Sequence, residues 1–515
     1  MSVHSHQVTE APEPMRFPFV GGIYSREIRS FSFQLALAFM IALITFLVLR
    51  SSDFLAVDGA LRALQVYYLD RPFLHPNSHL LYAVNLYVWS TMLRLLGIVA
   101  HDQVTFLRLA EAMNAIAAAA CLTIFYGLLH RLTNRRAVAA LATLGFGFSS
   151  AFLAHATSSA EPMVGLLWSE VSVVLAIYGC SRPKKWPLVA GGLLLALAMA
   201  TYQSMVLFGV PIVLMLWLHP SPAGGDFRTR RSNVAAAARF VTGFALGISI
   251  IYGTAYYLAG TRTLAGMIAR FLQLDGSGQV YSGVNIMKLA SALPGLAVSL
   301  FPILPPECGF RCLSDRHYLS WVPTAALAVA VAGICLVTLV LLARKLWTAM
   351  TATEKLATGS CAVGFLTTVV PVICWMPTYD KLWLQPLSCL FLGGGLLLSV
   401  AWRESNFRYL LMSGCALVAA IAVSNIALAV LAKTKPTPYL NEAREVAAVV
   451  APQDLIVGDW NNIFVLYQAF WAPRGNSFNV PTVAIHEGLQ TIPQLAESVA
   501  QTMSSGGQNG EKRNC

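Results

Sequence analysis

The sequence predicts an all-α polytopic membrane protein with about eleven transmembrane helices. Hydrophobic residues make up 57% of the 515 residues and charged residues only 11%, whereas a soluble domain carries about 25% charged residues. Apolar runs of roughly 20 residues recur along the chain, and each is long enough to cross a bilayer core of about 30 Å. The first run is too long for the apolar core of a signal peptide and is therefore interpreted as a retained anchor.

Short basic clusters between the apolar runs predict the topology. Although the net charge is +11, basic residues placed in turns between apolar helices encode orientation rather than nucleic-acid binding, and Lys and Arg stay on the cytoplasmic side. The predicted inner clusters contain Arg131, Arg135, Arg136, Arg182, Lys184, Lys185, Arg228, Arg230, Arg231, Arg239, Arg344, Lys345, Lys355, Arg403 and Arg408. The predicted spans are 32–50, 105–129, 137–155, 162–180, 187–201, 204–219, 238–257, 321–343, 356–374, 383–401 and 409–431.

Two stretches depart from the pattern of single spans of about 20 residues. A single helix over 187–219 would be about 50 Å long, too long for one span, so two short helices that turn at 201–203 are predicted. The stretch 79–98 is apolar but is interrupted by Asn85 and Arg94, and it is predicted as a juxtamembrane helix on the outer face. Counting it as a span gives the alternative, twelve spans with the N-terminus outside.

These spans divide the chain into a central membrane domain and two flanking parts. The predicted parts are a cytoplasmic N-terminal arm over 1–31, a transmembrane domain over 32–432 with outer loops 51–104 and 258–320, and a small extracytoplasmic C-terminal domain over 433–515. In the last part the sequence predicts a helix, a strand over 454–459 and an aromatic-rich helix over 461–471, which makes a small α/β extension. Its polar end has a composition typical of disorder.

The first outer loop is unlike the rest of the chain, because acids, bases and a His-Pro turn gather in it. Several pieces follow in order between Phe33 and Leu207: the segment Asp58-Gly-Ala-Leu-Arg62, the turn His75-Pro76, Phe106-Leu-Arg108 at the head of a helix, the inner turn HRLTNRR and the outer turn ATSSAE. This order resembles the GT-C superfamily of membrane glycosyltransferases, which includes protein O-mannosyltransferases and bacterial aminoarabinose transferases. The chain departs from the pattern at Gly59, where members often carry a second acid.

The resemblance implies a GT-C-like fold and a sugar donor linked to polyprenyl phosphate. The expected reaction moves the sugar to a hydroxyl of a glycan, lipid or protein on the outer face, with inversion of the anomeric configuration. A divalent metal ion is a further expectation from the resemblance, which the single acid at Asp58 weakens. The expected location is a bacterial inner (plasma) membrane, with the site facing the periplasm or exterior. A transporter or flippase of a lipid-linked saccharide and a non-catalytic GT-C-like assembly subunit are the alternatives.

Three carboxylates are candidates for the catalytic acid–base group. A hydroxyl is a poor nucleophile near neutral pH and needs a base. Asp58 is the first candidate, and the alternative is an N-cap for the helix that follows it. Asp53 is its substitute. Glu161 is expected to complete the site from the second outer turn, although Ser158-x-x-Glu161 also fits a capping box.

Basic residues are candidates for binding the donor phosphate, because a leaving phosphate needs a positive partner. These candidates are Arg62, Arg71, His75, Arg270 and Lys381. Arg62 and Arg71 could instead snorkel along the membrane surface, and His75 could be a solvated turn residue. Lys381 could be an interfacial anchor between Trp375 and Trp383.

Two further acids lie within predicted spans. Glu170 lies deep in its helix, where an ionisable residue indicates either a function or a structural pair. Glu111 is expected to pair with Arg108, which lies one turn before it.

Overall fold

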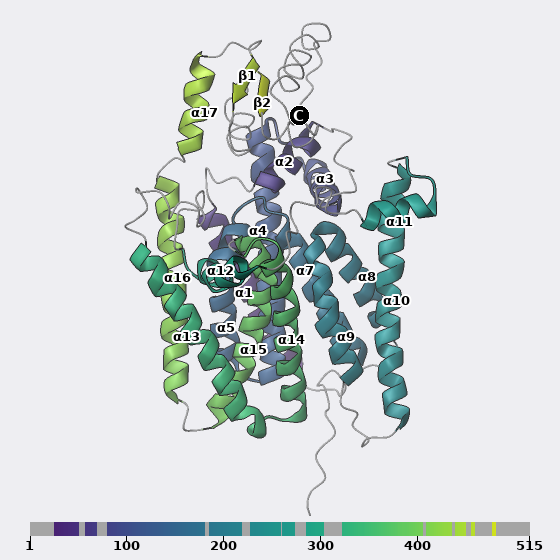
Figure 1. The fold of residues 1–515 in the computed structure, drawn as a ribbon, viewed down its shortest axis with the longest axis vertical. Coiled ribbons are helices and arrows are strands. Elements are labelled where there is room, and N and C mark those ends of the chain that lie inside the picture. The colour runs from purple at the N-terminus through teal and green to yellow at the C-terminus, as the bar shows by residue number, and fades with distance from the viewer. Residues whose placement is uncertain are drawn as a thin grey trace, which may run out of the picture.

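In the computed structural model of the chain, the described residues are 25–50, 57–68, 80–180, 185–218, 227–258, 260–272, 285–302, 322–377, 379–404, 408–434, 438–449, 455–458 and 476–479. Within these ranges the protein is a bundle of long helices with a cap of shorter elements at one end (Figure 1).

Eight of the described helices are long and apolar enough to cross a membrane. They are α1 (Ser25–Leu49), α4 (Gln103–Thr133), α7 (Pro162–Cys180), α10 (Phe227–Leu258), α13 (Val322–Leu346), α14 (Ala352–Cys374), α15 (Leu384–Arg403) and α16 (Arg408–Thr434). The other predicted spans correspond to shorter apolar elements, which are α5 (Arg136–Gly147) with α6 (Ser150–Ala156), α8 (Trp186–Thr201), and the 3₁₀ helix η2 (Gln203–Phe208) with α9 (Gly209–Leu218). The polytopic helical fold predicted from the sequence is therefore confirmed.

For one predicted span, the structure shows a bent pair of helices instead of the single helix expected. The run 137–155 was expected to be a single helix, but α5 and α6 meet at an angle of 71°. At the break, the Ser149 hydroxyl donates a hydrogen bond of 2.6 Å to the carbonyl of Phe146. A serine hydroxyl that binds a nearby backbone carbonyl offers the chain an alternative to the helical ladder. The bend carries α6 away from the line of α5 before the chain turns into α7.

The predicted double crossing over 187–219 is confirmed in outline. Helix α8 ends at Thr201 and η2 begins at Gln203, so the reversal lies at the predicted position. Close packing holds α8 against α10, because a Cβ atom at Gly192 would overlap the carbonyl oxygen of Phe240 and one at Gly243 would overlap that of Val189. Small residues let membrane helices approach this closely.

The cap lies beside the ends of α4, α7 and α8 (Figure 1). It contains α2 (Val57–Tyr67), α3 (Leu80–Leu95), α11 (Leu264–Leu272), α17 (Pro438–Val449), and the parallel strands β1 (Leu455–Gly458) and β2 (Asn476–Asn479). Helix α3 is not among the candidate spans, in agreement with the predicted juxtamembrane helix. Strand β1 lies within the predicted strand 454–459, while the predicted helix 461–471 and the end of the chain lie outside the described residues.

The predicted outer loop 258–320 contains an apolar element that the sequence analysis did not separate from it. Helix α12 (Ile286–Leu300) packs against α13, α14 and the 3₁₀ helix η6 (Asp380–Trp383). At Gly295 a Cβ atom would overlap the carbonyl oxygen of Pro377. The consequence is that α12 fixes the turn that leads into η6.

Candidate functional site

The turn between α6 and α7, residues 157–161, is held in place by hydrogen bonds from α4. Asn114 lies in the middle of α4 and is fully buried. Its side-chain amide donates hydrogen bonds of 2.8 Å to the carbonyl of Ser158 and 2.6 Å to the carbonyl of Ala160. Buried backbone carbonyls need such donors, so a single amide fixes the conformation of this turn.

Helix α3 holds the same turn from a second direction. The fully buried hydroxyl of Tyr82 donates a hydrogen bond of 2.5 Å to the carbonyl of Ser159. Burial raises the pKa of the Tyr82 phenol well above its usual value, and the negative charge of Glu161 raises it further. The phenol therefore stays protonated and keeps its role as donor, and Glu161 lies close enough to it to exert a field.

Glu161 is a buried carboxylic acid at the end of this turn, with 1% of its surface exposed. The capping box considered for Ser158 and Glu161 is wrong, because it would place the start of α7 at Ser159. The helix begins instead at Pro162, so Glu161 precedes it. Glu161 is therefore a buried acid on the turn that Asn114 and Tyr82 hold at the capped end of the bundle.

Helix α2 packs its first turn directly on the 157–161 turn. A Cβ atom at Gly59 would overlap the carbonyl oxygen of Ser159, so the backbone itself forms the contact. Asp58 is the neighbouring residue of α2. The first outer loop and the second outer turn therefore meet at Gly59, and the contact explains why a second acid does not follow Asp58.

The other candidates from the first outer segments have mixed outcomes. Arg62 is 9% exposed and donates a hydrogen bond of 2.7 Å to the Gln65 side chain, so it is packed within the protein instead of snorkelling. Arg270 lies in α11, near the end of α10. The candidates Asp53, Arg71 and His75 lie outside the described residues.

A charge cluster that the sequence analysis predicted only in part lies at the head of α4. The predicted pair is confirmed, with Arg108 donating a hydrogen bond of 2.9 Å to the carboxylate of Glu111. The guanidinium of Arg50, at the end of α1, lies 3.4 Å from the same carboxylate, which is buried. The carboxylate of Glu111 therefore contacts two cations. An arginine at the outer end of a span, against the usual inside bias, was the signal in the sequence.

A second polar cluster lies where η6 meets α6. His155 of α6 lies 3.4 Å from the carboxylate of Asp380. That carboxylate also accepts a hydrogen bond of 2.7 Å from the backbone N–H of Lys381. Because α6 continues directly into the 157–161 turn, this contact connects η6 to the segment that carries Glu161.

Lys381 is buried, with 7% of its surface exposed. Its ammonium lies 4.6 Å from the ring centre of Tyr379 and 6.0 Å from that of Tyr202. Tyr202 packs in turn on the first turn of α7, since a Cβ atom at Gly165 would lie 3.1 Å from its Cβ. Tyr202 therefore connects Lys381 to the first turn of α7, and Glu161 immediately precedes that turn.

The anchor alternative for Lys381 is also wrong. Trp383 is 2% exposed and donates a hydrogen bond of 2.7 Å to the carbonyl of Pro377. Gln385, in the first turn of α15, reaches η2 and donates a hydrogen bond of 3.0 Å to Ser204. The turn that carries Lys381 therefore packs against α6, α12 and α14 and is not exposed at a lipid interface.

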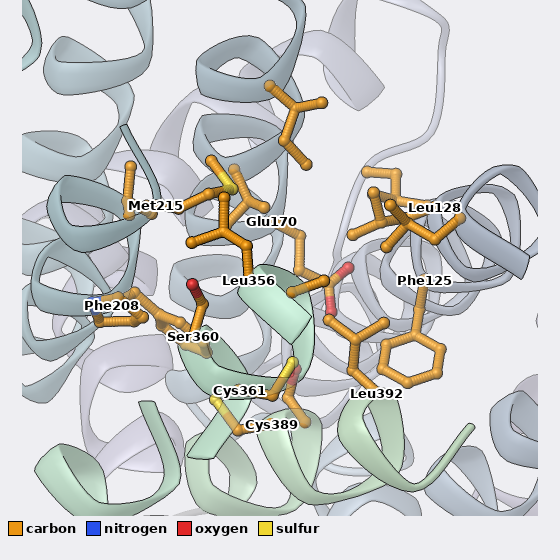
Figure 2. A pocket seen from close by; sticks show the side chains of 18 of the residues that line it. Phe125, Leu128, Glu170, Phe208, Met215, Leu356, Ser360, Cys361, Cys389 and Leu392 are labelled. Carbon is orange, nitrogen blue, oxygen red and sulfur yellow. The ribbon is translucent and has the colours of Figure 1, made fainter. Parts of the chain in front are cut away.

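Glu170 occupies a different place from the polar clusters. It lines a largely apolar pocket, with an empty volume of about 1100 Å³, between α4, α7, α9, α14 and α15 (Figure 2). The thiol of Cys121 in α4 lies beside the carboxylate of Glu170, and no described cation forms an ion pair with that carboxylate. The pocket lies deeper in the bundle than Glu161.

The described part of the chain contains no complete set of metal ligands. No group of three His, Cys, Asp or Glu side chains lies there in a position to hold a metal ion. Since divalent ions are held by several oxygen or nitrogen ligands, the expected divalent metal stays a prediction, and no chemical step is derived through it.

No protein-family model and no curated protein matches the chain. Among solved structures, the chain is similar to ArnT from Cupriavidus metallidurans, which was crystallised bound to undecaprenyl phosphate. The two are 13% identical, the TM-score is 0.53, and the match covers 91% of this chain and 90% of ArnT. At this identity the likeness concerns the fold. The protein is an integral membrane protein whose fold is similar to that of ArnT.

Proposed function

We propose that the protein transfers a sugar from a polyprenyl-phosphate carrier to an acceptor hydroxyl on the outer face of the membrane. The single observation that carries this proposal is the contact between two outer segments. Glu161 is buried on a turn fixed by Asn114 and Tyr82, and the first turn of α2, which contains Asp58, lies against that turn. The undecaprenyl phosphate bound to ArnT supports the donor class.

In the proposed reaction, a carboxylate activates the acceptor. The acceptor oxygen forms a bond to the anomeric carbon as the bond from that carbon to the phosphate oxygen breaks. The hydroxyl proton passes to a carboxylate base. We assign the base to Asp58, with Asp53 as its substitute, and assign to Glu161 the task of orienting the base or the acceptor. Direct displacement inverts the configuration at the anomeric carbon.

Cations receive the leaving group, polyprenyl phosphate. Lys381 is the described candidate with the best support, because its ammonium is buried beside two aromatic rings in the turn that contacts α6. Arg62, which is buried in α2 close to Asp58 in sequence, is a second described candidate for this role. Arg50 and Arg108, which both contact Glu111 at the head of α4, are further cations at the capped end of the bundle. Arg71, His75 and Arg270 remain sequence-based candidates for the same role.

The proposed location is a bacterial inner membrane with the capped end of the bundle outside. The inner side then carries the basic turns, as the distribution of Lys and Arg predicts. A polyprenyl chain would lie among the lipids with its phosphate at the interface, level with the outer ends of the helices.

The test measures release of polyprenyl phosphate by purified protein in nanodiscs. A panel of polyprenyl-phosphate sugars is supplied with an extract of envelope glycans and lipids as the source of acceptors. We expect Asp58→Asn and Glu161→Gln to lower turnover at least a hundredfold, because a positioned base contributes about 10² to 10⁴ in rate. The matched control is Glu404→Gln, an exposed acid at the other end of the bundle. Undiminished turnover in folded Asp58→Asn protein would remove the assigned role of Asp58.

Transport of a lipid-linked saccharide is the second candidate, and Glu170 is the observation that favours it. Transport uses ionisable groups at mid-membrane, and Glu170 lines a pocket at that depth. Reconstituted vesicles distinguish the two functions. A transporter would move labelled lipid-linked saccharide across the bilayer without forming a new glycosidic bond, and Glu170→Gln would abolish the movement. A transferase would form the bond irrespective of any movement.

A further inference from the structure

A basic pocket lies at the end of the bundle opposite the proposed transferase site. It is formed where α7 ends and where α8 and α10 begin, and its empty volume is about 820 Å³. In Figure 1 this is the end of α10 away from α11. The residues that line it are Cys180, Lys185, Arg231, Ser232, Asn233, Ala235, Ala236 and Arg239. Three of them are cationic and none is acidic.

The pocket holds two guanidinium groups for which the described residues supply no counter-charge. Arg231 and Arg239 have no hydrogen-bond or ion-pair partner in the described part of the chain. Both are exposed on one stripe of α10, together with Ala235, which lies between them along the helix. Lys185 differs, because its ammonium donates hydrogen bonds of 3.1 Å to the carbonyl of Gly179 and 3.3 Å to that of Cys180. The lysine closes the last turn of α7, while the two arginines remain available to a ligand.

Signalling of topology alone does not require this arrangement. Arg403, another basic residue at this end of the bundle, is engaged by Glu354 at 3.1 Å. Arg135 and Arg136, at the start of α5, are not among the residues that line this pocket. The inside bias of basic residues needs only their number and side. Arg231 and Arg239 line the same cavity, and the positive-inside bias does not require such convergence.

The walls of the pocket are held rigidly. The crossing of α8 and α10 at Gly192 and Gly243 brings the two backbones into contact. Arg239 lies about one turn before this crossing along α10, and Lys185 precedes α8 by one residue. Both helices therefore enter the crossing from the same end, and the pocket lies just before their contact. A rigid cavity loses little entropy when a ligand binds.

We propose that this pocket binds a phosphate group, either in the head group of an anionic phospholipid or as a soluble phosphate. Arginine forks match phosphate oxygens in pairs of hydrogen bonds, and basic pockets between membrane helices bind anionic lipid head groups. The side chain of Ser232 also lines the pocket. The site is independent of the proposed transferase reaction.

The experiment compares purified full-length protein in three nanodisc preparations. The first contains phosphatidylcholine only, the second contains phosphatidylcholine with phosphatidylglycerol, and the third contains phosphatidylcholine with inorganic phosphate added to the buffer. Lipid retention by native mass spectrometry and the melting temperature are the readouts. The test variant is Arg231→Gln with Arg239→Gln, and the matched control is Arg135→Gln with Arg136→Gln, which removes the same charge elsewhere at this end. A second variant, Ala235→Phe, fills the pocket without changing any charge.

We expect phosphatidylglycerol to be retained and to raise the melting temperature of the unmodified protein. The double arginine variant should weaken retention about thirtyfold, since each basic residue near an anionic surface contributes on the order of a factor of five. Ala235→Phe should weaken it as well, and the control should not. An effect that appears with inorganic phosphate alone supports the same site with a soluble occupant. Equal losses in the test and control variants, or no loss in either, would overturn the proposal.

Discussion

The backbone of Gly59 lies in direct contact with the carbonyl of Ser159, so that two segments a hundred residues apart in sequence form one surface. This contact fixes the distance between the first turn of α2 and the turn that ends in Glu161. It also leaves no room for a side chain at position 59.

We expect Gly59→Ala to damage the site while leaving the bundle folded. The added methyl group must push α2 away from the 157–161 turn, and such overpacking costs about 1–3 kcal/mol. Transferase turnover should fall at least tenfold, because a shift of about 1 Å in a positioning element is enough for a larger loss. Gly359→Ala is the matched control, since a Cβ atom there meets no neighbouring atom. Activity that survives Gly59→Ala would show that the two segments move independently.

The buried phenol of Tyr82 predicts a loss of stability at alkaline pH. Its pKa is raised in the folded protein by burial and by Glu161, so the folded state holds the phenol proton when the unfolded state has lost it. Stability is therefore full below the unfolded pKa of about 10 and declines as the pH rises above it. We expect Tyr82→Phe to show a weaker decline between pH 9 and pH 11, at about 1 kcal/mol lower stability near neutral pH from the lost hydrogen bond. Thermal melts across that range provide the measurement, and parallel curves for both proteins would contradict it.

Removal of the Lys381 charge should weaken donor binding. We expect Lys381→Met, which keeps most of the side-chain volume, to lower affinity for polyprenyl phosphate about tenfold or more, because a buried ammonium interacts strongly with a phosphate. Lys355→Met removes a lysine near the start of α14, at the opposite end of the bundle, and serves as the control. Binding of undecaprenyl phosphate to protein in nanodiscs, measured by native mass spectrometry, checks this. If both variants bind alike, Lys381 is only a packing residue.

Glu170 should lower stability in the isolated protein. Burying a carboxyl in apolar surroundings costs free energy, and the polar neighbour of the Glu170 carboxyl among the described residues is the thiol of Cys121, a weak donor. We expect Glu170→Met to raise the free energy of unfolding by about 1–3 kcal/mol, visible as a higher melting temperature. A lower melting temperature would mean that the carboxyl has a stabilising partner outside the described residues.

The sequence was sufficient for the arrangement of helices because hydropathy and basic turns follow directly from burial in lipid. All eleven predicted spans have a helical counterpart, including the reversal between Thr201 and Gln203. The bend between α5 and α6 was not predicted, since it depends on one serine hydroxyl binding one carbonyl. Such local competition leaves the hydropathy of the segment unchanged.

The site was predictable at the level of segments but less so at the level of contacts. Glu161 and Lys381 were selected by residue type and position, and their burial was not foreseen. Arg50 was overlooked because its partner Glu111 is distant in sequence. Asn114 was overlooked for a different reason, since a lone amide inside an apolar helix has no motif and gains meaning only when its carbonyl partners are known.

The clamp on the 157–161 turn relies on main-chain oxygens, which every amino acid possesses. Substitutions at Ser158, Ser159 and Ala160 by other small residues can accumulate without loosening it, provided that Gly59, Tyr82 and Asn114 persist. Chains built on this scheme can drift apart in composition while their architecture stays recognisable. Comparisons of amino-acid sequence alone would then miss relatives that comparisons of three-dimensional structure still detect.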